Sequence, residues 1–296
     1  MILKHPSSKK KLLNMTVEKN KILHSEGKKP ILYDVYYENS VTPKPIVVFC
    51  HGYKGFKDWG AWDLVAQAFA KSGFFFLKFN FSHNGGTIEQ PIDFPDLEAF
   101  SKNNYSLELD DLERVINLVT SGNPYSAYID PTHLSLIGHS RGGGIVLIKA
   151  EENPAVKKVI SLAGVSDFKK RFQEGSEGFK KWKETGRTFV ENGRTKQQMP
   201  HDWQFYEDFK ANEGRLTIER AVRNLKIPQL IIHGSNDDSV AIEEAITIHS
   251  WNSKSSLEII TNADHVFGSS HPWPESELPK DLQKAVALMI AFITQN

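Results

Sequence analysis

The sequence predicts an α/β protein with a doubly wound, mostly parallel sheet and helices on both of its faces. Short apolar runs typical of buried strands alternate along the chain with stretches whose apolar residues recur at helical spacing. The length of 296 residues, with 40% hydrophobic and 24% charged residues, suits one large globular domain. Neither a repeat nor a low-complexity tract interrupts this pattern.

The predicted strands are short and rich in apolar residues, and residues 46–50 form a continuous apolar run of the kind buried on both faces of a parallel sheet. In chain order they are residues 31–37, 46–50, 74–79, 134–137, 156–162, 230–232 and 257–260. The predicted helices carry an apolar stripe at the 3.6-residue period. They are residues 62–70, a helix that opens at Ser106, residues 142–150, residues 240–249, and a C-terminal helix with Leu282, Val286, Met289 and Ile293 on one face.

The alternation stops between about residues 166 and 223. This stretch is polar, has no run typical of a buried strand, and yet carries aromatic residues that include Trp182 and Trp203. We expect a mostly helical insertion over the carboxyl ends of the strands, where open α/β sheets bind ligands. Since the aromatic side chains need a place to be buried, we interpret the insertion as a short lid; a surface excursion is the alternative.

The N-terminal residues 1–15 are expected to be a flexible tail, with residues 16–296 forming a single domain. Three lysines at 9–11 are followed by only two leucines, which is too short an apolar stretch for a secretory signal. We therefore predict a cytoplasmic protein. Strand-like sequence begins just after Met15, so this methionine is an alternative start.

Composition argues against several classes of protein. The 36 basic residues balance 36 acidic ones, whereas a dedicated nucleic-acid binder normally has a basic excess. The single cysteine, Cys50, cannot form an intrachain disulfide, and no apolar run approaches the ~20 residues of a membrane helix. There is no H-E-x-x-H motif and no cluster of histidine and cysteine at ligand spacing, so we expect no metal site.

A strand, a turn and a helix surround Ser140. Residues 134–137 run into the pentapeptide GHSRG at 138–142, a G-x-S-x-G turn, and a small-residue helix follows. In this context the turn is sharp, and the serine hydroxyl stands at a helix N-terminus that favours developing negative charge. We predict Ser140 as a nucleophile; an incidental serine in a glycine-rich connection is the alternative.

A serine nucleophile needs a base and an orienting acid, which on this fold follow it in the order acid, then histidine. The loop after residues 230–232 carries Asp237 and Asp238. We predict Asp237 as the acid and keep Asp238 as the alternative, since an aspartate there can also cap the next helix.

Three histidines remain as candidates for the base: His249, His265 and His271. His265 follows residues 257–260 by a short loop, from which a side chain can reach both the serine and the acid. His249 falls inside a predicted helix, and no strand leads to His271. We therefore predict His265 as the base.

Two backbone N–H groups are expected to form an oxyanion hole. One belongs to Arg141, directly after the nucleophile. The other comes from the loop 51–59 after an earlier central strand, and by position it is the N–H of Tyr53. His51 in that loop is interpreted as structural. The turn 81–87 lacks the pattern of a phosphate loop and is expected to line one side of the cleft.

Together these pieces resemble the α/β-hydrolase superfamily. The segments HGY at 51–53, GHSRG at 138–142, HGSND at 233–237 and DH at 264–265 occur in the order typical of that superfamily, from about residue 31 to the C-terminus. The short lid and the H-G-x-x-D pattern resemble the dienelactone-hydrolase-like and cinnamoyl or feruloyl-esterase-like branch, and related acylaminoacyl-peptidase-like domains. Dienelactone hydrolases proper use a cysteine nucleophile, so the serine argues against that specific activity.

The resemblance implies a sheet of the α/β-hydrolase type and a serine esterase that cleaves small to medium carboxylic esters through an acyl-enzyme, without a cofactor. We expect a small-molecule ester as partner, neither nucleic acid nor membrane, and a monomer or homodimer. A peptidase on short or acylated peptides is the alternative, and a non-catalytic binding module is a remote one. The side chains of Arg141, Trp182 and Trp203 are expected to contact substrate, although Arg141 could instead form an internal ion pair.

Overall fold

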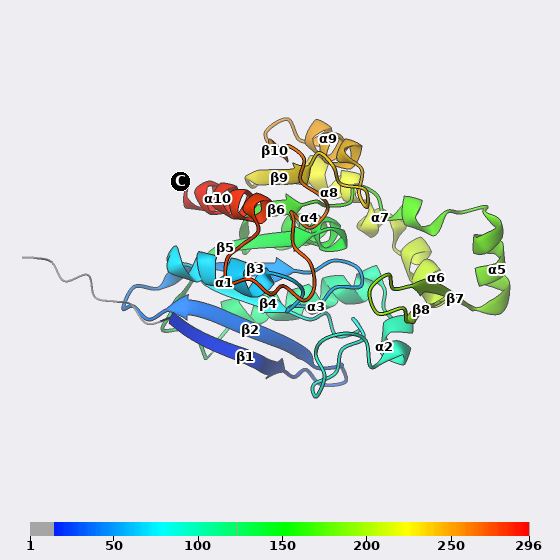
Figure 1. Ribbon diagram of the computed structural model, residues 1–296, viewed down its shortest axis with the longest axis horizontal. Coiled ribbons are helices and arrows are strands. Elements are labelled where there is room, and N and C mark those ends of the chain that lie inside the picture. The colour runs from blue at the N-terminus through cyan, green and yellow to red at the C-terminus, as the bar shows by residue number, and fades with distance from the viewer. Residues whose placement is uncertain (1–14, 123, 296) are drawn as a thin grey trace, which may run out of the picture.

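The computed structural model describes residues 15–122 and 124–295, and an eight-stranded sheet forms its centre (Figure 1). The strand order is β1-β2-β4-β3-β5-β6-β9-β10. The strands are β1 Met15–Leu23, β2 Ile31–Glu38, β3 Lys44–Cys50, β4 Phe75–Phe79, β5 Ile129–His139, β6 Val156–Leu162, β9 Gln229–Gly234 and β10 Ser256–Ile260. From β4 to β10 every neighbouring pair is parallel, whereas β2 is antiparallel to both β1 and β4. The predicted mostly parallel fold is therefore confirmed. The predicted tail lies outside the described residues, apart from Met15 at the start of β1.

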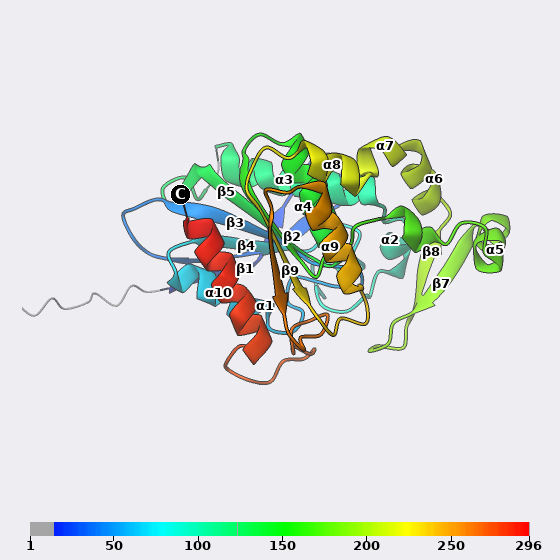
Figure 2. The same cartoon turned by 90° about the horizontal axis from the view of Figure 1, so that it is seen from above.

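Helices cover both faces of the sheet (Figure 2). One face carries α1 Trp62–Lys71 and α10 Lys280–Thr294. The other carries α3 Tyr105–Thr120, α4 Arg141–Glu152, α8 Ile218–Asn224 and α9 Ile242–Trp251. The apolar stripe predicted for α3 is fully buried, and each such side chain contributes about 1.5–3 kcal/mol. Within the described residues, no helix combines the length and apolarity that crossing a membrane requires.

A cluster of buried charges lies beside the loop that follows β3. Lys57 Nζ is 2.8 Å from Asp34 Oδ1 and 2.6 Å from Asp58 Oδ2. Lys78 Nζ is 2.9 Å from Asp34 Oδ2, 2.5 Å from Asp58 Oδ1 and 2.6 Å from Asp63 Oδ1. The three carboxylates are close enough together to hold a metal ion, but the two ammonium groups pair with them instead. The cluster thus ties the end of this loop to β2 and β4.

The segment between β6 and β9 is the insertion expected from the sequence, and it projects beyond one end of the sheet (Figure 1). Before α8 it contains η1 Lys169–Phe172, α5 Glu177–Thr185, β7 Arg187–Glu191, β8 Gln198–Asp202, α6 Gln204–Ala211 and α7 Glu213–Leu216. Most of its elements are helical, but β7 and β8 form an antiparallel hairpin that the sequence analysis did not predict. Neither strand has the apolar run of a buried strand, because β7 is mostly exposed and β8 contains Pro200.

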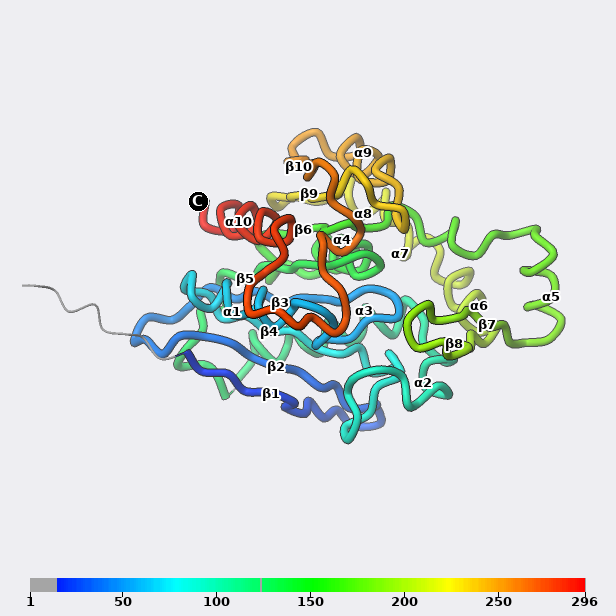
Figure 3. Tube along the Cα trace, in the orientation of Figure 1, coloured from blue at the N-terminus to red at the C-terminus, as the bar shows by residue number. Residues whose placement is uncertain are grey.

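The segment between β10 and α10 passes over the start of α1, as the trace in Figure 3 shows. The backbone N–H of Gly60 donates to His271 Nδ1 at 3.0 Å, and that of Ala61 donates to Ser269 Oγ at 3.1 Å. His271, one of the three histidines considered as the base, is therefore engaged in this packing contact.

Candidate active site

Ser140 occupies the sharp turn between β5 and α4. Its φ of 57° and ψ of −119° are unusual for a residue with a side chain, and such a conformation costs of order 1–3 kcal/mol. The backbone around it fixes this geometry, since Ser140 N–H donates to Leu162 O at 2.9 Å and Ser140 O accepts from Gly143 N–H at 2.9 Å. A Cβ on Gly138 would lie 2.1 Å from Gly142 O, so the turn has no room for a side chain there.

Asp237, in the loop after β9, has a fully buried side chain that accepts several hydrogen bonds. Its Oδ1 accepts from the N–H groups of Ser239 at 2.9 Å and Val240 at 2.8 Å. Its Oδ2 is 2.8 Å from His265 Nδ1 and 3.2 Å from His233 Nε2. Burial raises the pKa of Asp237, but the hydrogen bonds from the two histidines outweigh burial and hold this pKa well below its usual range.

His265 lies in the loop after β10 and lines the same cavity as Ser140. Because Nδ1 is bound to Asp237, Nε2 is the ring nitrogen left to accept a proton from the serine. In the described part of the chain the serine hydroxyl and the His265 ring are not hydrogen-bonded to each other, and such contacts commonly tighten when substrate binds.

His139 holds the backbone of His265, a role that the sequence analysis did not assign. His139 Nε2 donates to His265 O at 2.9 Å, and the two rings lie 4.8 Å apart. Burial lowers the pKa of His139 to about 3, so the ring is neutral near pH 7 with its proton on Nε2. The only signal in the sequence is its place within the G-x-S-x-G turn.

The alternative acid and base lie elsewhere. Asp238 is exposed, and its carboxylate accepts from Ser239 Oγ at 3.2 Å. His249, on α9, is bonded through Nδ1 to Ser255 Oγ at 2.7 Å. Neither residue lines the cavity that contains Ser140, and nor does His271. The structure thus brings together the three residues preferred from the sequence.

The loop after β3 runs directly past the nucleophile. A Cβ on Gly52 would lie 2.8 Å from Ser140 Cβ, so glycine is required by this close approach. The backbone N–H groups of Tyr53 and Arg141 donate to no acceptor within the described residues, which leaves both available to an oxyanion. His51 is buried and bonded to Gly52 O and Phe81 N, as expected for a structural residue.

The side chain of Tyr53 connects this loop to the insertion. Its hydroxyl is hydrogen-bonded to His201 Nε2 on β8 at 2.7 Å, and burial lowers the pKa of His201 to about 3, so that the ring is neutral near pH 7. The guanidinium of Arg141 lies 4.3 Å from the centre of the Tyr53 ring and donates to Glu108 Oε1 at 3.2 Å. Arg141 therefore forms an internal ion pair, with a partner on α3 that the sequence analysis missed.

A cavity of about 620 Å³ lies between the sheet and the insertion. It is lined by Tyr53, Lys54, Tyr105, Ser140, Arg141, Val165, Phe168, Arg171, Phe172, Gln173, Ser176, Gly178, Phe179, Trp182, Thr188, Val190, His201, Phe205, Ser239, Val240 and His265. Trp182, one of the two tryptophans expected to contact substrate, is part of this wall. Trp203 is not: its ring packs 5.2 Å from that of Trp182.

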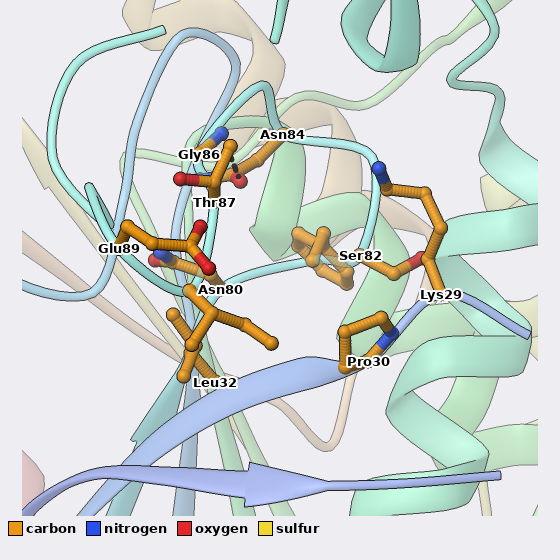
Figure 4. Close-up of a pocket in the computed structure, with 11 residues that line it drawn as sticks. Lys29, Pro30, Leu32, Asn80, Ser82, Asn84, Gly86, Thr87 and Glu89 are labelled. Atoms are coloured by element: carbon orange, nitrogen blue, oxygen red, sulfur yellow. Dashed lines mark hydrogen bonds between the residues drawn. The ribbon is translucent and has the colours of Figure 1, made fainter. Parts of the chain in front are cut away.

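A second, smaller hollow of about 180 Å³ lies along the loop that follows β4 (Figure 4). Its walls include Ser82, Asn84, Gly86, Thr87 and Lys29. The expectation that the turn 81–87 lines the cleft beside the nucleophile is therefore wrong, because these residues face this separate hollow. The turn folds back on itself, with Gly86 N–H donating to Asn84 Oδ1 at 3.0 Å.

Comparisons with known proteins agree with this fold. Est1E from Butyrivibrio proteoclasticus, solved with ferulic acid bound, superposes with a TM-score of 0.71 at 16% identity and covers 93% of this chain and 100% of its own. A dienelactone hydrolase from Anabaena variabilis gives 0.60 at 19% identity, covering 95% and 96%. A puromycin-hydrolyzing peptidase from Mycobacterium tuberculosis gives 0.63 at 18% identity, covering 95% of this chain but 39% of the peptidase.

No curated protein matches the sequence significantly. The family model of the alpha/beta hydrolase fold, however, matches residues 45–214, which is more than half of the chain and includes β3, the Ser140 turn and most of the insertion. The structural neighbours include members of the branch that the sequence resembles. The chain belongs to the alpha/beta hydrolase fold family.

Proposed function

We propose that the protein is a serine hydrolase that cleaves small to medium carboxylic esters through an acyl-enzyme. The observation that carries the proposal is the meeting of Ser140 with the hydrogen-bonded pair His265–Asp237 at one cavity. The cavity volume of about 620 Å³ falls within the range of sites for small molecules. A cytoplasmic location, a small-molecule ester as partner and the lack of a cofactor remain predictions.

In the first half of the reaction, Ser140 Oγ attacks the ester carbonyl carbon while His265 Nε2 takes the serine proton. The carbonyl electrons move to oxygen, and the N–H groups of Tyr53 and Arg141 stabilise that charge. Removing one such donor costs roughly 3 to 4 kcal/mol of transition-state stabilisation. The C–O bond to the alcohol then breaks, the alcohol leaves with the proton from His265, and the acyl group stays on Ser140.

In the second half, His265 takes a proton from water as the water oxygen attacks the acyl carbonyl. Collapse of the second intermediate breaks the bond to Ser140 Oγ, which regains its proton from His265, and the carboxylic acid leaves. Throughout, Asp237 accepts the Nδ1–H of His265, which fixes the tautomer and stabilises the imidazolium that forms in each half.

A peptidase activity is the second candidate, because the same triad cleaves amides and one neighbour is a puromycin-hydrolyzing peptidase. This chain spans only 39% of that neighbour, so it matches a part of that protein only. The ester reaction is preferred because Est1E aligns over its whole length.

The test compares p-nitrophenyl esters from acetate to decanoate with aminoacyl p-nitroanilides as substrates. We expect ester turnover with an optimum chain length, abolished in Ser140→Ala and unchanged in Ser250→Ala, which removes an exposed hydroxyl on α9. Turnover of the anilides without turnover of any ester would instead identify a peptidase. Equal ester turnover by wild type and Ser140→Ala would reject the proposed nucleophile.

A further inference from the structure

We propose that the preferred substrate carries a carboxylate, bound beside the nucleophile by Lys54 and Arg141. The inference rests on the proposed function and names its substrate class. Both cations lie against the same ring: the Lys54 ammonium is 5.1 Å and the Arg141 guanidinium carbon 4.3 Å from the centre of the Tyr53 ring. Both residues line the cavity that contains Ser140 and His265.

The wall of the cavity is cationic without a matching acid. Among the described residues that line it are Lys54, Arg141 and Arg171, and none is an aspartate or glutamate. Two of these cations have acidic partners that do not line the cavity. Arg171 pairs with Glu244, and Arg141 pairs with Glu108. Within the described part of the chain Lys54 pairs with no carboxylate, and its ammonium donates to the backbone carbonyl oxygen of Glu191 at 3.2 Å. An anion in the cavity would therefore meet an uncompensated positive charge.

Arg141 retains most of its hydrogen-bonding capacity despite its ion pair. A guanidinium has five N–H donors in a planar fork that matches a carboxylate, and Arg141 uses one of them, on Glu108 Oε1. The Tyr105 and Phe205 rings lie 5.2 and 5.4 Å from its guanidinium carbon, so they hold the group in place. The Glu108 carboxylate outweighs the effect of burial and raises the pKa of Arg141, which keeps it charged.

Lys54 provides independent support. Burial and the nearby Arg141 both lower the pKa of its ammonium, which means that the surrounding protein disfavours this charge. A bound carboxylate would reverse that effect and would form charge-assisted hydrogen bonds with both cations. The aromatic residues of the wall, such as Phe172 and Trp182, leave room for an apolar body attached to the carboxylate.

The test uses two pairs of esters in which the carboxylate of one member is replaced by a neutral methyl ester in the other. Monomethyl and dimethyl glutarate place the carboxylate on the acyl side, while 4-acetoxybenzoate and its methyl ester place it on the leaving group. For each pair, kcat/KM of the anionic member is divided by that of the neutral member. We expect Lys54→Met to lower this ratio about tenfold in at least one pair, as the loss of a hydrogen bond to a charged group implies.

Two further variants control the measurement. Lys54→Arg keeps the charge and should keep the ratio, whereas Lys284→Met, which removes an exposed lysine on α10, should leave it unchanged. For Arg141 the variant is Arg141→Met combined with Glu108→Gln, because Arg141→Met alone would leave a buried carboxylate unpaired. A ratio unaffected by Lys54→Met in both pairs would overturn the inference while leaving the esterase proposal intact.

A binding measurement separates the carboxylate site from the chemistry. Calorimetry compares 4-hydroxybenzoate with 4-hydroxybenzamide on Ser140→Ala, in which no turnover occurs. We expect tighter binding of the benzoate, lost in Ser140→Ala/Lys54→Met. Equal binding of both compounds would reject a carboxylate site on the leaving-group side, whereas charge-selective binding by a protein that hydrolyses no ester would reject only the proposed reaction.

Discussion

Replacing Asp237 by asparagine should abolish most activity by reversing the tautomer of His265. The Oδ1 atom of Asp237 accepts from two backbone N–H groups, so the single oxygen of an asparagine would stay in that position. Its Nδ2 would then face His265 Nδ1, which donates to Asp237 now, and His233 Nε2, which lies 3.2 Å from Asp237 Oδ2 and donates to Val240 O at 2.8 Å. To avoid two opposed donors, His265 must carry its proton on Nε2, where it can no longer accept the proton of Ser140.

The expected loss follows from this geometry. A base locked in the wrong tautomer lowers kcat by about 10⁴ in serine hydrolases with this triad, which corresponds to roughly 5 kcal/mol. Asp238→Asn is the matched control, because Asp238 is exposed and contacts only a neighbouring hydroxyl. We expect that variant to retain wild-type kcat within about twofold, since surface substitutions perturb free energies by about 0.5 kcal/mol or less.

The assay is steady-state hydrolysis of p-nitrophenyl acetate by both variants, with circular dichroism to establish that each is folded. A folded Asp237→Asn that keeps more than a tenth of wild-type kcat would refute the reasoning. A larger loss in Asp238→Asn than in Asp237→Asn would transfer the role of the acid to Asp238.

Three further outcomes follow from the contacts. Gly52→Ala should lower kcat at least tenfold with a smaller change in KM, because its Cβ would stand 2.8 Å from Ser140 Cβ and displace the loop after β3, which carries the Tyr53 N–H. Unchanged ester kinetics would contradict this prediction. Lys78→Met should destabilise the fold by about 3–5 kcal/mol in urea titrations, since it removes one of the two buried ammonium groups that balance the carboxylates of Asp34 and Asp58; a loss below 1 kcal/mol would argue against the charge cluster. Asp237, with its lowered pKa, contributes stability above its unfolded pKa of ~3.9 that is lost as pH falls through the folded value. The difference in unfolding free energy between wild type and Asp237→Asn should therefore be larger at pH 6 than at pH 3, and a difference independent of pH would contradict the assigned ionisation.

Most of the sheet could be predicted from the sequence because its strands are short, apolar and buried on both faces. Each of the seven predicted strands has a counterpart in the structure. The β7–β8 hairpin could not be predicted, because β7 is mostly exposed and β8, although mostly buried, is a short segment with a proline and no run of apolar residues. The burial of Lys78 could not be predicted either. A lysine inside an apolar run gives no sign that its side chain is buried, and its partner Asp34 lies 44 residues away along the chain.

The positions of Ser140, Asp237 and His265 follow from topology, since each comes directly after a parallel strand and such loops share one edge of the sheet. The residues that support them carry no such signal. Glu108 is one of many charged positions on a helix, and His201 lies in the unpredicted hairpin. Their roles depend on side-chain contacts between distant segments, which a local pattern does not encode.

The most direct test of the central claim is covalent labelling with a fluorophosphonate probe, followed by intact mass spectrometry and peptide mapping. We predict one adduct per chain on Ser140, no adduct in Ser140→Ala, and labelling slowed by at least a hundredfold in His265→Ala, because the base is then missing. A folded wild-type protein that takes up no probe, or an adduct that persists in Ser140→Ala, would contradict the assignment of Ser140 as the nucleophile.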